Sequence, residues 1–483
     1  MRKEQIMPTP LIKLYYKNVM ADAIGPRHGI TARQFDALAK KTSPLIAMLN
    51  EERKAGQTPY RDLPYNEEIP KKVKKLKTKF KGRCENLVVL GIGGSALGII
   101  ALQTALKPYM HNIYEKKRTG PRFFVFDNVD PSQFASFLHW IGNKLGKTVF
   151  NVISRGGQTA ETIAEFMIIR RLLLRKLGRK GYQKRVVITT AFGKKNTLLN
   201  IAKKEALDHL RIPDGVGGRF SVLSAVGLFS AAMCGIGIDS LLEGARAMDK
   251  KVSRRNFYKN PAAINAAINY HFYNHGKKIT AMMPYSYALK DLTGWFKQLW
   301  AESLGKARDL DGKTVHIGPT PIKALGATDQ HSQVQLYREG PNDKLFTFLQ
   351  VNSFDEDPRI GAAPRCAPEI SFLAGNNLSS LLNNEKKATE YALLQDRRPC
   401  LTVLFDKVNE YTVGEFIYLY EVTTSFAGAL FKIDPYSQPA VELGKQATFA
   451  LKGRKGDYKP GLTYQQWAKE IRTRTKVDKK FLV

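Results

Sequence analysis

Two short segments of this chain carry the residue types that proton transfer requires. Residues 301–306 contain Glu302, and residues 326–332 contain His331. Gln298 lies four residues before Glu302, so the two side chains share one face if the segment is helical. Aromatic residues in the same segment would partly desolvate the Glu302 carboxylate, which suits a general base. A surface glutamate at a helix end would show the same pattern, so Glu302 alone does not decide the chemistry.

The surroundings of His331 suggest a helix start. Thr328 and Asp329 precede it, and both residue types favour the N-cap position. A helix N-terminus disfavours a charged imidazolium, which would leave a neutral ring ready to accept or donate a proton. We therefore expect His331 to open a helix, although a histidine at such a position is often structural.

Two loops rich in glycine and hydroxyl residues each follow a predicted strand. In residues 91–95 the glycines let the backbone approach a ligand and leave N–H groups free for an anion. The spacing is not the dinucleotide fingerprint GxGxxG, and a tight packing turn explains this loop equally well. Residues 154–162 add hydroxyls and a cation that can donate to phosphate oxygens. Together the loops predict a phosphosugar pocket. Its candidate binding residues are Gly93, Gly94, Ser95, Ser154, Arg155, Gly156, Gly157, Gln158, Thr159 and Gln298.

A third glycine turn, residues 214–221, delivers Arg219 immediately before an uncharged segment, residues 221–238. Its serines and glycines favour a buried helix over a membrane span, which needs roughly 20 apolar residues. Arg219 could pair with a surface carboxylate. Beside a buried segment, we favour a cation that faces a cleft.

Apolar runs alternate with helical patterns along most of the chain. Residues 1–83 look helical. Continuous apolar strands separated by helices predict parallel sheets covered on both faces. The first set of predicted strands covers 87–90, 123–126, 149–153 and 186–190, with a helix over 161–177. The second set covers 279–283, 345–350 and 401–405, with a helix over 288–302.

The composition is strongly basic, with 76 Lys and Arg against 43 Asp and Glu, a formal net charge of +33 over 483 residues. Such a charge is compatible with nucleic-acid or membrane-surface binding, but also with solvated helical faces. The basic runs show no aromatic stacking pattern, so we expect no specific nucleic-acid or membrane partner. Four scattered cysteines and no apolar stretch after residues 1–5 indicate a cytoplasmic protein. His271 and His275 have a metal-compatible spacing without an acidic cluster, and we expect no metal.

Several of these segments occur in the order found in glucose-6-phosphate isomerases, and the chain resembles the shorter bacterial form of that family. The matching segments are 91–98, 154–162, 216–228, 302–306, 326–335 and 438–445. Because the segments keep a fixed order, they are specific in a way that no single one is.

The resemblance implies an α/β fold with two doubly wound parallel-sheet subdomains of sugar-isomerase (SIS) type, each an α-β-α sandwich. We expect an N-terminal helical segment over 1–84 that packs on the second subdomain, and subdomains over 85–250 and 251–436. A C-terminal helical segment would cover 437–483. The family needs no metal or organic cofactor and is usually dimeric.

The resemblance also implies roles for individual residues. Glu302 corresponds to the base that moves a proton between C1 and C2 through a cis-enediol(ate), and Arg219 to the cation that stabilises it. His331 corresponds to a ring-opening histidine contributed by the other subunit, which Glu161 orients. Lys445 corresponds to a lysine that assists ring opening. The phosphate loop departs from the family pattern, because Arg155, Gly156 and Gln158 replace a lysine and two hydroxyl residues.

The implied activity is interconversion of D-glucose 6-phosphate and D-fructose 6-phosphate, in glycolysis and gluconeogenesis. One alternative is an isomerase that also acts on mannose 6-phosphate. Another is a non-catalytic SIS module that binds sugar phosphates, which would not need Glu302, His331 and Lys445 together. A nucleic-acid binder would rest on charge alone.

Overall fold

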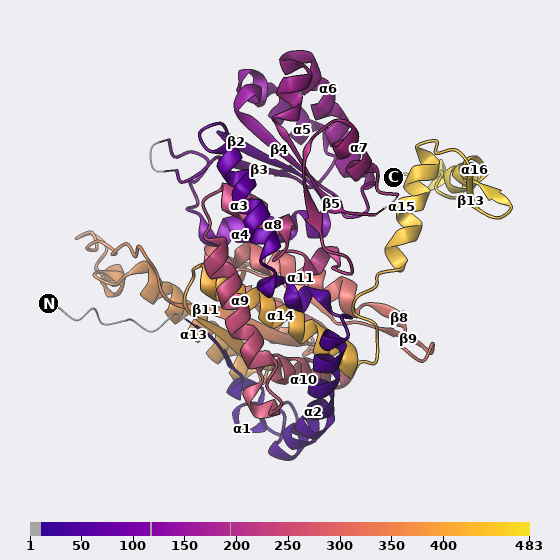
Figure 1. Ribbon diagram of the computed structural model, residues 1–483. Helices are drawn as coiled ribbons and strands as arrows, with labels where there is room; N and C mark the ends of the chain where they lie inside the picture. The colour runs from indigo at the N-terminus through magenta and orange to yellow at the C-terminus, as the bar shows by residue number, and fades with distance from the viewer. Residues whose placement is uncertain (1–10, 116–117, 194) are drawn as a thin grey trace. The chain divides into compact units, whose positions relative to one another are not determined.

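The computed structural model describes residues 11–115, 118–193 and 195–483, and the chain divides into two compact units (Figure 1). The first unit is Met1–Pro435 and the second is Tyr436–Val483. The first contains two five-stranded sheets, which confirms the predicted α/β architecture with two sheets. No division falls between the two sheets, so the subdomain boundaries at residues 84 and 250 remain predictions. Residues 1–5, where we expect no signal peptide, lie outside the described residues.

The first sheet is parallel throughout, with strand order β3-β2-β4-β5-β6. Its strands are β2 (Asn86–Leu90), β3 (Arg122–Phe126), β4 (Thr148–Ile153), β5 (Val186–Ala191) and β6 (Asp208–Ile212). The four apolar runs predicted as strands are confirmed. The edge strand β6 was not predicted, because its sequence DHLRI alternates polar and apolar residues and has no continuous apolar run.

Helices cover the first sheet on both faces. These are α3 (Glu68–Phe80), α4 (Leu97–Leu106), α5 (Pro131–Ile141), α6 (Ala160–Gln183), α7 (Thr197–Lys204) and α8 (Ala225–Met233). Phe134 and Phe137 of α5 and Phe166 of α6 join Val88 and Phe150 of the strands in one buried core, and Figure 1 shows α5 and α6 close to β3 and β4. All nine residues of α8 are buried, as the uncharged segment predicted. No helix in the described part of the chain is long and apolar enough to span a bilayer.

The second sheet has the order β1-β12-β11-β7-β10. Its strands are β1 (Ile12–Tyr15), β7 (Ile279–Pro284), β10 (Thr320–Lys323), β11 (Lys344–Ser353) and β12 (Cys400–Lys407). Four of them are parallel, but β1 runs antiparallel to β12. The helical prediction for the N-terminal segment is therefore wrong over β1. Ile12 is buried there, and its N–H donates to Glu415 at 2.8 Å, so distant residues determine the strand.

The other α-helices of the first unit are α1 (Ala21–Ile24), α2 (Ala32–Lys54), α9 (Ile238–Val252), α10 (Pro261–Asn274), α11 (Lys290–Leu304), α12 (Val334–Glu339), α13 (Leu378–Gln395) and α14 (Glu410–Leu430). Nearly all residues of α14 are buried, and α2, α9, α10 and α11 pack against it, whereas α12 packs against α13. After α11 the chain forms a hairpin of β8 (Lys306–Arg308) and β9 (Thr314–Ile317). Helices α11 and α4 pack against each other, which links the second half to the loop that precedes α4.

The second unit has its own small core. It contains α15 (Ala440–Leu451), the ribbon of β13 (Asp457–Lys459) and β14 (Leu462–Thr463), and α16 (Tyr464–Arg474). Ala450 of α15 packs with Tyr464, Trp467 and Ala468 of α16.

One buried carboxyl in α14 predicts an unusual dependence of stability on pH. Glu421 is fully buried, and neither carboxyl oxygen has a hydrogen-bond partner in the described residues. Burial raises the pKa of Glu421 well above its ordinary value, so the folded protein keeps a proton that the unfolded chain releases. Because the folded state binds more protons, stability falls as the pH rises above the ordinary glutamate pKa.

We therefore expect Glu421→Gln to stabilise the protein increasingly between weakly acidic and alkaline pH, by up to about 1.4 kcal/mol per pH unit. Urea unfolding at several pH values measures this difference. The exposed Glu243 of α9 supplies the control, because Glu243→Gln should leave the pH dependence unchanged. If the free energy of unfolding depends on pH in the same way for wild type and Glu421→Gln, the prediction is contradicted.

Candidate functional site

Glu302 lies in the last turn of α11, on its partly exposed side. Trp295 and Trp300 of the same helix are buried, whereas the Glu302 side chain retains 33% of its exposure. Gln298 Nε2 donates to Glu302 Oε1 at 3.1 Å, as the four-residue spacing predicted. The buried Gln298 Oε1 accepts no hydrogen bond from the described residues, so this acceptor remains available beside the carboxylate.

Arg219 lies in a 3-10 turn, Gly218–Phe220, and its side chain is only 1% exposed. Its guanidinium reaches partners on other segments. Nε donates to Ser303 Oγ at 2.7 Å, Nη2 donates to the Pro435 carbonyl at 2.6 Å, and Nη1 lies 3.5 Å from Glu302 Oε2. Burial lowers the pKa of Arg219, and the negative charges of Glu302 and Asp434 oppose that shift. The structure thus holds a buried cation against a half-buried carboxylate.

The first glycine loop packs against the backbone of the turn that contains Arg219 and against the Gln298 side chain. Residues Gly93–Ser95 form a 3-10 turn between β2 and α4. A Cβ atom on Gly94 would lie 2.2 Å from the Gly218 carbonyl carbon, and one on Gly93 would lie 2.9 Å from Gln298 Nε2. Only glycine fits this close approach of two backbones. The structure therefore brings the 93–95 loop, Arg219, Gln298 and Glu302 together.

The second loop, residues 154–159, is held in shape by its own side chains. Ser154 is buried, and its Oγ accepts a hydrogen bond from the Gly157 N–H at 3.1 Å and bonds to Thr159 Oγ1 at 2.8 Å. Gln158 Nε2 donates to Thr197 Oγ1 at 3.1 Å. The loop leads into α6, whose first N–H groups have no intrahelical acceptor, an arrangement that favours anions.

The Arg155 guanidinium of this loop is exposed, and its positive charge contributes to lowering the pKa of Arg219. Arg155 is therefore within electrostatic range of the buried cation. Gly156, which replaces a residue with a side chain in the family pattern, has open space where a Cβ would be.

Glu161 in the first turn of α6 belongs to an acidic group that the sequence analysis missed. Glu165 follows one helical turn later and is 3% exposed, and its Oε1 has no partner in the described residues. Burial, together with the negative charges of Asp127 and Glu161, raises the pKa of Glu165 to about 8. The four-residue spacing of two glutamates on an amphipathic helix was the available signal, but only the packing of α6 on the sheet shows that one of them is buried.

The prediction that His331 opens a helix is wrong. His331 ends a 3-10 turn, Thr328–His331, and α12 begins only at Val334. Asp329 does not cap a helix, because its carboxylate accepts hydrogen bonds from the Leu325 N–H and the Ser332 hydroxyl, both at 2.6 Å. His331 is exposed, and within the described residues it forms no hydrogen bond or ion pair with Glu302 or Arg219.

Lys445 lies in the middle of α15 in the second unit, and its side chain is exposed there. Its assigned role in ring opening remains a prediction.

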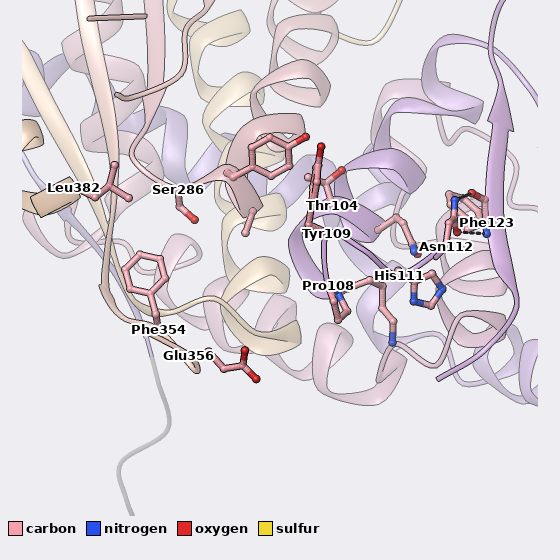
Figure 2. Close-up of a pocket in the computed structure, with 14 residues that line it drawn as sticks. Thr104, Pro108, Tyr109, His111, Asn112, Phe123, Ser286, Phe354, Glu356 and Leu382 are labelled. Atoms are coloured by element: carbon pink, nitrogen blue, oxygen red, sulfur yellow. Dashed lines mark hydrogen bonds between the residues drawn. The ribbon is translucent and has the colours of Figure 1, made fainter. Parts of the chain in front are cut away.

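A cavity of about 760 Å³ lies elsewhere, at the opposite ends of α4 and α11 from Gly93 and Glu302. Figure 2 shows Ser286 and Phe354 on one side of it and Tyr109 and His111 on the other. None of the predicted site residues lines this cavity, so it is separate from the Glu302 site.

Across the described ranges, no group of three or more His, Cys, Asp or Glu side chains could hold a metal ion. His271 and His275 stack on each other with ring centroids 4.0 Å apart, and His275 Nδ1 bonds to the His271 carbonyl.

A family model and a curated relative both match this chain over most of its length. A family model described as phosphoglucose isomerase matches residues 72–456. The chain is 42% identical over 451 residues to a glucose-6-phosphate isomerase of Carboxydothermus hydrogenoformans, covering 92% of this chain and 95% of that protein.

Two solved structures are also similar. A crystal structure of a hypothetical protein from Thermus thermophilus is 31% identical with a TM-score of 0.79, over 92% of this chain and all of that one. A glucose-6-phosphate isomerase from Chlamydia trachomatis has a TM-score of 0.75 over 88% of this chain and 87% of that one. At 22% identity, the second similarity supports the fold alone.

Proposed function

Because this chain belongs to the phosphoglucose isomerase family, we propose that it interconverts D-glucose 6-phosphate and D-fructose 6-phosphate. The observation that carries this proposal is the pairing of Arg219 with Glu302 at 3.5 Å, in a site that also contains the 93–95 loop and lies within electrostatic range of Arg155. The enzyme is an intramolecular oxidoreductase of glycolysis and gluconeogenesis. No finding favours the two alternatives, activity on mannose 6-phosphate or a non-catalytic binding module.

The chemistry follows from these two charged groups. Glu302 removes the proton from the carbon next to the carbonyl, and the electron pair moves onto the carbonyl oxygen to form the enediolate. Arg219 places a fixed positive charge where that oxygen becomes negative, and its burial strengthens the interaction. Glu302 then returns the proton to the former carbonyl carbon, while the hydroxyl proton passes from one enediolate oxygen to the other and the new carbonyl forms. Hydrogen and electrons balance within the substrate, so no redox partner is needed. Gln298 holds the carboxylate through Oε1 during both steps.

The phosphate group of the substrate binds at the two loops. The backbone N–H groups of Gly93 and Gly94, and those of Gly156, Gln158 and Thr159 before α6, provide donors, and Arg155 provides charge. In this proposal the side chains of Ser154 and Thr159 mainly stabilise the conformation of the loop, because they already form a hydrogen bond with each other. Backbone donors thereby replace the hydroxyl side chains that the family pattern has at Gly156 and Gln158.

Ring opening of the cyclic substrate requires a further acid and base, and we assign it to His331 and Lys445. In this proposal the enzyme is a cytoplasmic homodimer, and His331 serves the active site of the other subunit, where Glu161 orients it. The exposure of His331 and its lack of contact with Glu302 in one chain support this arrangement.

The direct test is a coupled assay of fructose 6-phosphate conversion with purified protein in the presence of a chelator. We expect full activity, because Arg219 supplies the charge that a metal would otherwise provide. Absence of conversion with and without added divalent cations would refute the proposed function. Activity that depends on the cation would refute only the metal-free assignment.

Mixing two inactive variants tests the shared site. If His331 acts across the interface, Glu302→Gln and His331→Ala protomers should together form heterodimers in which one of two sites is intact. Complete exchange should restore about one quarter of wild-type activity, because about half of the dimers are mixed. Native mass spectrometry verifies the exchange. No recovery in verified heterodimers would show that each site is self-contained.

A further inference from the structure

Lys306 follows the proposed base, Glu302, by four residues and was not among the predicted site residues. The chain turns at Gly305 and enters β8, and the Lys306 side chain folds back over the end of α11. Its Nζ donates to the Glu302 carbonyl at 2.7 Å and to the Ser303 carbonyl at 2.6 Å. The last carbonyls of a helix have no intrahelical donor, and a cation there also interacts favourably with the helix dipole.

Ser303 joins this lysine to the buried arginine. The Ser303 hydroxyl accepts from Arg219 Nε at 2.7 Å, while its carbonyl accepts from Lys306. Two cations therefore hold the same residue from two directions, one residue after Glu302. Ser303 itself is fully buried, which leaves the last turn of α11 little freedom to move.

The charges around Lys306 come from three segments: Arg219 in its 3-10 turn, Asp434 after α14, and Glu302 on α11. Burial, and next the positive charge of Arg219, lower the pKa of Lys306 to about 8, while Asp434 and Glu302 oppose the shift. Lys306 is consequently charged at neutral pH and becomes neutral in moderately alkaline solution.

We propose that Lys306 is a positioning residue for Glu302: its ammonium fixes the last turn of α11 against Arg219, so that the carboxylate approaches the reacting carbons in one geometry. This inference rests on the proposed function, in which Glu302 is the base. A displacement of about 1 Å of a catalytic group can reduce a rate about 10²-fold, so holding the backbone of the base matters for turnover. A neutral amine binds carbonyls more weakly than an ammonium. Loss of the Lys306 proton therefore weakens its hydrogen bonds to the Glu302 and Ser303 carbonyls.

Three variants separate this role from an ordinary helix-capping role. Lys306→Met removes the donor, Lys306→Arg keeps a charge at all accessible pH values, and Lys297→Met is the control on an exposed face of the same helix. The assay measures kcat and KM from about pH 6 to about pH 10.

We expect Lys306→Met to lower kcat about 10- to 100-fold at neutral pH, with KM changed less than about threefold. Wild-type kcat should decline in an alkaline limb near pH 8, where Lys306 loses its proton. This limb should be absent in Lys306→Met and shifted to higher pH in Lys306→Arg. Lys297→Met should match wild type.

Two results would overturn the inference. The first is that Lys306→Met folds and has the same kcat as Lys297→Met. The second is that the kcat of Lys306→Arg declines at the same alkaline pH as that of wild type. If Lys306→Met does not fold, the Lys306→Arg profile decides alone. A failure of the proposed function is distinguishable, because wild type would then not isomerise the substrate at all.

Discussion

Replacing Glu302 by glutamine lowers kcat by at least about 10²-fold, in the range typical of losing general acid–base catalysis. Glutamine keeps the shape of the side chain and can still bond to Gln298, but it cannot accept the substrate proton. The loss should fall on kcat rather than on KM, because the substrate still has both phosphate-binding loops and Arg219. Steady-state kinetics in both reaction directions measures the effect.

Proton exchange with solvent gives a second readout for the same variant. Wild-type enzyme should exchange the transferred hydrogen of fructose 6-phosphate with deuterium from heavy water, and Glu302→Gln should lose this exchange together with turnover. The exposed Glu243→Gln variant is the matched control and should keep both. Wild-type turnover in correctly folded Glu302→Gln would remove Glu302 from the role of base.

The strands of the two sheets were largely predictable because burial on both faces leaves a signal in the sequence. β2 and β4 are continuous apolar runs, and every one of their residues is buried. β1 and β6 carry no such signal. β1 is a strand because Ile12–Tyr15 pairs with β12 and the Ile12 N–H bonds to Glu415, contacts that span almost the whole chain.

The site shows the same division between local and long-range information. The Gln298–Glu302 hydrogen bond follows from helical periodicity, so the sequence predicted it. The contact between Arg219 and Ser303 joins residues 84 positions apart and depends on how α11 packs beside the 218–220 turn. Periodicity contains no information about that packing. The family resemblance implied only that Arg219 and Glu302 act in the same reaction, and it did not imply the contact with Ser303.

His331 and Lys306 show why residue type and spacing are insufficient at turns. Thr328 and Asp329 are good N-cap residues, but Asp329 uses its carboxylate within the turn, so no helix starts at His331. In the sequence, Lys306 is indistinguishable from an ordinary charged residue that follows a helix. Its role depends on the helix ending at Gly305, since the ammonium then reaches the carbonyls of Glu302 and Ser303.

Arg219→Lys should reduce kcat about 10²- to 10³-fold, similar to the loss of one donor from an oxyanion site. The guanidinium holds Ser303, Pro435 and Glu302 from three different nitrogen atoms. A lysine ammonium is a compact point charge on a flexible stem and cannot reproduce this planar fork. The charge would survive, but its position relative to the developing oxyanion would not.

Binding of a transition-state analogue separates this effect from a general loss of structure. A carboxylate or hydroxamate analogue of the enediolate should lose affinity for Arg219→Lys by a factor similar to the fall in kcat/KM, because both report stabilisation of the same negative oxygen. The KM for fructose 6-phosphate should change much less. Arg211→Lys, at an exposed arginine of β6, is the control and should alter neither quantity.

Stability must be measured in parallel, because Arg219 is buried. A substitution that leaves the Ser303 hydroxyl or the Pro435 carbonyl without a donor costs about 1–3 kcal/mol for each unpaired group. Urea unfolding would reveal that cost as a lower midpoint, and assays well below the midpoint then compare folded enzymes. If the folded Arg219→Lys enzyme binds the analogue as tightly as wild type does, the positive charge stabilising the enediolate must come from another residue, and Arg155 is the exposed cation within range of the site.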